Sequence, residues 1–184
     1  MTLDPGHFHA ALIQKTSYKD IDTTVDVYAP EGPEVKDFLN KIEGYNSRDE
    51  NPTNWSVKTH FREDYLEKMI AEKPGNVMVV SGKNSKKIDY ILAAVNAGLH
   101  VYAAKPLVVD QEGFKKLEKV FEIAKEKNLL VYDIMTERFE VTTGIQKALS
   151  MEPKVFGMLL DGSPSEPVSY THLRAHETLM NLVC

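Results

Sequence analysis

Lys105 is the residue whose type and position most strongly suggest chemistry. It ends a strand-like run that begins after Gly98, and apolar residues at helical spacing precede that glycine. The pattern indicates a helix-to-strand crossover, so we expect Lys105 at the carboxyl end of a parallel strand, where open α/β sheets bind ligands. A lysine partly shielded from water there could have its pKa lowered enough to take or share a hydroxyl proton. As a purely structural residue, Lys105 would only extend along a sheet edge.

A second candidate site lies at residues 4–9, which read D-P-G-H-F-H after a short strand-like run. Backbone amides at such a turn can bind the diphosphate of a dinucleotide. Only Gly6, Ala10 and Ala11 supply the small residues that this requires, so the string is a degenerate form of G-x-G-x-x-G/A. An ordinary Pro-Gly turn explains it equally well.

Two histidine pairs have spacings that resemble those of metal ligands. His7 and His9 lack a third ligand at a suitable distance in the sequence. His172 and His176 are four residues apart, but the following Glu177 does not fit the order H-E-x-x-H. We therefore expect no metal site.

Glu31 stands about 25 residues after the first turn, where a dinucleotide fold uses a carboxylate to bind the adenosine ribose. A solvated turn carboxylate is an equally good interpretation. No basic residue stands at this turn to favour a 2′-phosphate, so the sequence slightly favours NAD over NADP.

Strand-like runs alternate with amphipathic helices from residue 1 to about residue 149. Because parallel neighbours need crossover connections, this alternation predicts an α/β fold with a doubly wound, mostly parallel Rossmann sheet of about six strands. After the first strand at Met1–Asp4, the expected strands are Thr24–Tyr28, Trp55–Phe61, Asn76–Val80, the run after Gly98, and Leu129–Ile134. The expected helices include His9–Lys15, segments with apolar stripes from Val35 and Tyr65, and Val141–Leu149.

Side chains at helix starts provide further expectations. Asp64 with Glu67 resembles a capping box, Asn84 or Ser85 could cap the helix before Gly98, and Asp110 could cap the helix that follows Lys105.

The composition excludes several classes of protein. The chain has 184 residues, a net charge of -5 and no basic block, which argues against a nucleic-acid partner. Its single cysteine, Cys184, permits no intrachain disulfide, and no apolar run is long enough for a membrane span. We expect a cytoplasmic protein, or an exported form if residues are missing before Met1.

Residues 97–107 read A-G-L-H-V-Y-A-A-K-P-L, which resembles the A-G-K-H-V-x-x-E-K-P-L of the Gfo/Idh/MocA family of NAD(P)-dependent oxidoreductases. The resemblance implies that Lys105 is catalytic and works with a histidine from a second domain. Ala104 departs from the family, because it stands where a glutamate could orient the lysine.

The resemblance also implies further site residues. Residues 81–84 (S-G-K-N) align with the family's A-T-P-N, while Lys87 replaces the usual histidine. Arg138 corresponds to an arginine on the substrate side, although a surface arginine at a helix start is as good an interpretation. The expected cofactor-binding residues are Gly6, His7, Phe8, His9, Glu31, Ser81, Gly82, Asn84, Lys105 and Pro106.

The end of the chain breaks the alternating pattern. We expect a Rossmann domain at 1–150, the start of a truncated substrate domain at 151–167 with a strand at Gly157–Leu160, and a non-native tail at 168–184 that resembles a translated sequencing adapter.

The expected function is the cofactor-binding domain of an oxidoreductase that acts on a sugar, polyol or related hydroxylated compound by hydride transfer. This fragment would itself be inactive, because the substrate domain is missing. A non-catalytic dinucleotide-binding or regulatory module is the alternative, and homo-oligomerisation of the intact protein stays open.

Overall fold

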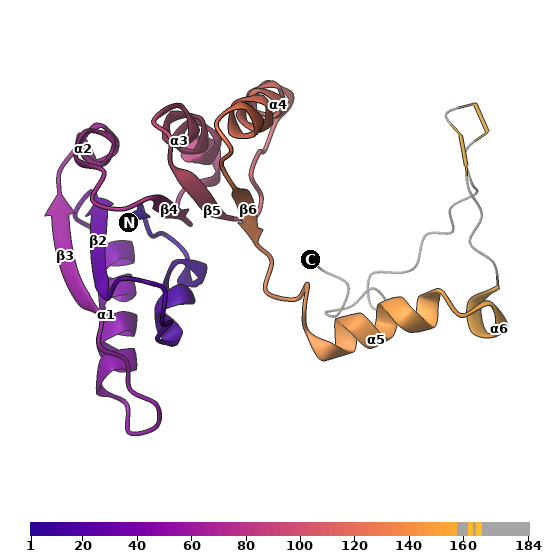
Figure 1. Ribbon diagram of the computed structural model, residues 1–184, viewed down its shortest axis with the longest axis horizontal. Coiled ribbons are helices and arrows are strands. Elements are labelled where there is room, and N and C mark those ends of the chain that lie inside the picture. Colours follow the sequence, from indigo (N-terminus) through magenta and orange to yellow (C-terminus); the bar gives the residue numbers. More distant parts are fainter. Residues whose placement is uncertain (158–161, 164, 167–184) are drawn as a thin grey trace. The chain divides into compact units, whose positions relative to one another are not determined.

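The computed structural model describes residues 1–157, 162–163 and 165–166. They contain one six-stranded sheet, in which every neighbouring pair of strands is parallel (Figure 1). This confirms the predicted fold class. The strand order is β3 (Ser56–Phe61), β2 (Thr24–Ala29), β1 (Thr2–Leu3), β4 (Val77–Val80), β5 (His100–Ala104) and β6 (Val131–Ile134).

The chain divides into two compact units, Met1–Ile134 and Met135–Cys184. The first contains the sheet, two 3-10 turns and four helices, which are η1 (Phe8–Ala11), η2 (Ile13–Lys15), α1 (Pro33–Ser47), α2 (Tyr65–Glu72), α3 (Asn84–Asn96) and α4 (Gln111–Glu126). The second contains α5 (Val141–Ser150) and α6 (Pro153–Phe156). Residues 158–160 of the expected strand and the tail 168–184 lie outside the described residues.

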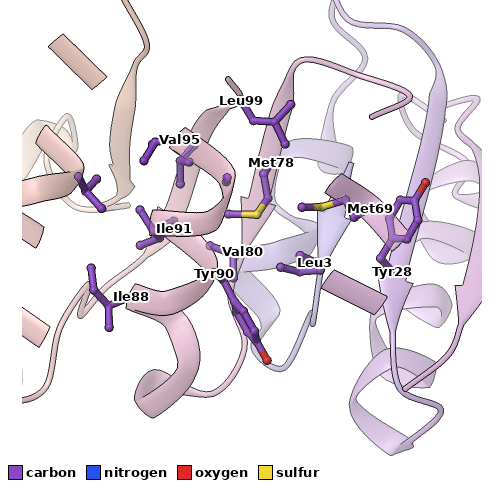
Figure 2. Packing of buried hydrophobic residues seen from close by; sticks show 14 of the residues in the cluster. Leu3, Tyr28, Met69, Met78, Val80, Ile88, Tyr90, Ile91, Val95 and Leu99 are labelled. Carbon is purple, nitrogen blue, oxygen red and sulfur yellow. The ribbon is translucent and has the colours of Figure 1, made fainter. Parts of the chain in front are cut away.

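Alternate residues of the central strands point to opposite faces of the sheet, which accounts for separate core clusters. Tyr28 packs in the larger core with side chains from α2, α3 and α4, whereas its neighbour Val27 packs in a second core with α1 and η1. Figure 2 shows Met69 near Leu3 and Met78 in the larger core. The sheet is therefore covered by helical segments on both faces, as parallel sheets require.

The expected helix His9–Lys15 is wrong in type. Its bonds join residues three apart, from the Ala10 N–H to the His7 carbonyl and from the Leu12 N–H to the His9 carbonyl, and so form 3-10 turns. Apolar spacing over so short a segment does not distinguish these two helical forms.

The four expected helix-terminus features have different outcomes. Gly98 has a φ of 82° just after α3, and the Asp110 carboxylate accepts a bond from the Gly113 N–H at 2.6 Å, so both predictions are confirmed. The capping box is wrong, because Asp64 makes no cap bond and instead accepts bonds from Arg62. Asn84 is the first residue of α3 and not its cap.

Candidate functional site

A cavity of about 650 Å³ lies at the carboxyl ends of four strands. Its walls come from Asp4 after β1, Pro30 after β2, Ser81 after β4 and Lys105 after β5. The β1 strand pairs with β2 on one side and β4 on the other, so the strand order reverses here. Open α/β sheets bind ligands at such a switch point.

The cavity brings together most of the residues expected from the sequence. Those lining it are Gly6, His7, Glu31, Ser81, Gly82, Asn84, Lys105 and Pro106. Phe8 and His9 are not among the lining residues; Phe8 is half exposed, and His9 is buried in η1. Arg138 lies in the second unit, before α5.

Two glycines allow the loops after β1 and β4 to approach each other closely. A Cβ atom at Gly82 would lie 2.3 Å from the Asp4 carbonyl oxygen, and one at Gly6 would lie 3.2 Å from the Gly82 Cα. The Ser81 hydroxyl also donates a bond to the His7 carbonyl at 3.3 Å. The cavity floor is therefore backbone at Gly6 and Gly82, which permits the close approach of a diphosphate. The Asp4 carboxylate lies beside this floor, with one oxygen 2.6 Å from the position of a Cβ added at Gly82.

The Asp4 carboxylate is hydrogen-bonded to the first of two linked tyrosine hydroxyls. The Tyr90 hydroxyl donates to this carboxylate at 3.4 Å, and the Tyr65 and Tyr90 hydroxyl oxygens are 2.5 Å apart. Burial raises the pKa of Tyr90, so this phenol stays protonated as a donor at neutral pH. Sequence reasoning missed Asp4 as a lining residue, although it directly precedes the expected Pro-Gly turn.

Lys87 is a further lining residue that sequence reasoning did not include in the site. Its ammonium donates to the Asn84 side-chain oxygen at 2.8 Å and to the Pro106 carbonyl at 3.1 Å. Burial, and then the charge of Lys105, lower the pKa of Lys87 to about 8. Its position three residues after Asn84 on a helix was the available sequence signal.

Lys105 and Lys87 also affect the pKa of His7, in the turn after β1. Burial, followed by the charges of Lys105 and Lys87, lowers the pKa of His7 below its usual range. His7 is thus neutral at neutral pH, which agrees with its Nδ1 accepting a bond from the His9 N–H at 3.4 Å. Positive charge near the backbone floor favours an anionic ligand.

Glu31 lies between β2 and α1, on the side of the cavity opposite Lys105, which follows β5. Its side chain is 69% exposed, and a carboxylate oxygen lies 3.8 Å from the Lys36 ammonium. The carboxylate is thus accessible to a ligand, and such an exposed ion pair contributes little to stability.

The described residues contain neither a metal-binding cluster nor a helix that could span a membrane. Across residues 1–157 and the four further described positions, no three His, Cys, Asp or Glu side chains are placed to hold a metal ion. In the same part of the chain, no helix combines the length and apolar character that crossing a membrane requires.

Several solved structures that share this fold are oxidoreductases. A protein of Parabacteroides merdae assigned as an oxidoreductase is 53% identical, with a TM-score of 0.83 over 90% of this chain and 38% of its own length. The scyllo-inositol dehydrogenase of Lactobacillus casei, solved with NAD(H) and scyllo-inositol, is 16% identical, with a TM-score of 0.58 over 84% of this chain and 41% of its own.

The biliverdin reductase of Synechocystis, solved with biliverdin and NADP+, is 14% identical, with a TM-score of 0.56 over 81% of this chain and 42% of its own. The two more distant structures support the fold alone. No protein-family model and no curated protein matches the chain. The chain spans about two fifths of the length of these three structures.

Proposed function

We propose that the chain is the N-terminal Rossmann part of an oxidoreductase of the Gfo/Idh/MocA type, and that its cavity binds NAD or NADP. The intact protein then transfers a hydride to or from a sugar, polyol or related hydroxylated compound. The observation that carries the proposal is the cavity at the reversal of the strand order, with a backbone floor at Gly6 and Gly82.

Different residues around the cavity would bind different parts of the cofactor and the substrate. The Gly6 N–H already donates to the Asp4 carbonyl at 2.9 Å, so the turn would hold the diphosphate through its other backbone groups and through the space that Gly6 leaves open. Ser81 and Asn84 would lie on the nicotinamide side. When bound, the nicotinamide ring gives or accepts the hydride. Lys105 holds or removes the hydroxyl proton of the substrate.

The choice between the two dinucleotides rests on Glu31. Its exposed carboxylate can accept bonds from a ribose that carries two hydroxyls, and it repels a 2′-phosphate. We therefore favour NAD. The nearby Lys36 ammonium partly offsets this repulsion, so the preference should be modest.

The domain organisation follows from the same proposal. Residues 1–150 supply the dinucleotide domain, residues 151–167 begin a substrate domain, and residues 168–184 form a non-native tail. Arg138 is assigned to the substrate side.

A non-catalytic module that binds dinucleotide is the second candidate, and Ala104 favours it. This side chain is 2% exposed and packs with Val79 and Ile134. An apolar contact therefore occupies the place where the family has a glutamate, and Lys105 lacks that carboxylate as a neighbour.

Titration of the chain with NADH and NADPH, monitored by cofactor fluorescence, tests the binding proposal. We expect saturable binding of both, tighter for NADH, and weaker binding for Lys105→Ala than for the control Lys115→Ala, which changes an exposed lysine of α4. If neither cofactor binds, the cofactor assignment is wrong.

The enzyme and the module differ in a second measurement. In the intact protein, NAD reduction by a polyol should occur and should be lost in Lys105→Ala. Binding of NADH without turnover of any hydroxylated compound would favour the module.

A further inference from the structure

Lys87 is a buried cation in a part of the fold where buried charges are rare. Its residue is 1% exposed, on the face of α3 that also carries the core residues Ile88 and Ile91. Burying an ammonium group is unfavourable unless hydrogen bonds replace its hydration. The hydrogen bonds that Lys87 makes therefore indicate its role in the structure.

Both acceptors of the Lys87 ammonium are neutral oxygens on different elements. Asn84 is in the first turn of α3, and Pro106 is in the turn between β5 and α4. Among the described residues, Lys87 forms an ion pair with no carboxylate, whereas the next acidic residue, Asp89, pairs with Lys116. The ammonium thus links two backbone segments and does not serve to neutralise an acid.

The segment that Lys87 holds is the one that carries Lys105. Pro106 directly follows Lys105, and both residues line the cavity with Asn84 and Lys87. A donor to the Pro106 carbonyl restrains the peptide plane next to Lys105, in a turn outside any helix or strand. Restraint of this kind keeps a reactive group in a productive position.

We propose that Lys87 is a positioning residue for Lys105: its ammonium ties the turn after β5 to the start of α3 and so holds Lys105 at the cavity. This inference rests on the proposed function, because it takes Lys105 to be the residue that meets cofactor and substrate. It assigns Lys87 a role that is exerted through Lys105, although Lys87 also lines the cavity.

The first test needs no cofactor. Lys87→Met keeps the length of the side chain and removes its donors, and Lys86→Met is the matched control, because Lys86 is an exposed neighbour on the same helix. Deuterium exchange of residues 104–110 should be about tenfold faster in Lys87→Met, because bonds from a charged donor are lost, and unchanged in Lys86→Met. Equal exchange in the two variants would show that Lys87 does not restrain the turn after β5.

The second test asks whether Lys87 acts through Lys105. We expect Lys87→Met to weaken NADH binding about tenfold in the wild-type background and to have almost no effect in a Lys105→Met background. A merely structural role would give the same loss in both, and that result would overturn the proposal.

The two tests separate the inference from the function on which it rests. If the wild-type chain binds no dinucleotide, the proposed function fails, while the exchange measurement still decides whether the tie exists. If Lys87→Met does not fold, Asn84→Ala removes one acceptor at an exposed position, and a smaller increase in exchange of residues 104–110 is expected. Unchanged exchange in Asn84→Ala would then contradict the tie.

Discussion

Gly82 shows how a single residue sets the distance between two loops. It shares the cavity floor with Gly6, and the carbonyl oxygen of Asp4 occupies the space that a side chain at position 82 would need. The obstructing atom belongs to the backbone, which cannot rotate away as the end of a flexible side chain can. The approach of the loops after β1 and β4 therefore requires glycine at position 82.

Gly82→Ala should lower the free energy of unfolding by about 1–3 kcal/mol, because one of the two loops must move. Gly44→Ala is the control, since a Cβ added there would meet no atom within 4 Å other than its chain neighbours and the backbone of α1. That substitution should stabilise the protein by about 1 kcal/mol or less through helix propensity. Urea denaturation followed by circular dichroism measures both, and a loss of stability no larger in Gly82→Ala than in Gly44→Ala would contradict the steric argument.

At the scale of the element, two helix starts that both begin with aspartate differ in structure. Asp110 has an extended backbone, with φ -150° and ψ 174°, which directs its carboxylate to the Gly113 N–H. Asp64 has φ -90° and ψ 35°, and its carboxylate is bound by Arg62. An acidic residue before an apolar stripe is thus insufficient to form a cap, because the backbone must be extended and the side chain must be available.

Asp110→Ala should destabilise the protein by about 1 kcal/mol, since α4 loses its cap. Asp64→Ala removes only an exposed ion pair and should change stability by less than about 1 kcal/mol. Thermal denaturation of the two variants compares these effects. A larger loss in Asp64→Ala would mean that the cap at α4 contributes less than its geometry indicates.

At the scale of the whole molecule, buried titratable groups determine how stability depends on pH. Lys87 has a pKa of about 8 in the folded chain against 10.5 when unfolded, so between these values the unfolded chain binds more protons. Stability must then rise with pH in this window. Burial raises the pKa values of Tyr28 and Tyr90. Above about pH 10 these phenols therefore stay protonated in the folded chain but lose their protons in the unfolded chain, and the free energy of unfolding falls as the pH rises.

The free energy of unfolding should increase from pH 8 to pH 10, with a slope from Lys87 of at most about 1.4 kcal/mol per pH unit. Urea denaturation at several pH values measures this slope. The slope should flatten in Lys87→Met and persist in Lys86→Met. An unchanged slope in Lys87→Met would show that the Lys87 ammonium is not desolvated in the folded chain.

The sequence by itself determined the parts of this protein that depend on local periodicity and on turn residues. The alternation of strands and helices predicted the parallel sheet, Gly98 and Asp110 predicted two helix boundaries, and Lys105 was placed at the carboxyl end of a parallel strand. These predictions succeed because the carboxyl ends of parallel strands meet at the same edge of the sheet, whatever the details of packing. The domain boundaries and the roles of the site residues stay predictions.

Only the tertiary structure decided the contacts between segments far apart in the sequence. Asp4 meets Gly82 across 78 positions, and Lys87 reaches Pro106 across 19. Local periodicity carries no information about such pairs, because each side chain finds its partner only when the sheet has formed. The burial of Lys87 and the closeness of the two loops that form the cavity floor therefore depend on packing, and these features give the cavity its charge and its shape.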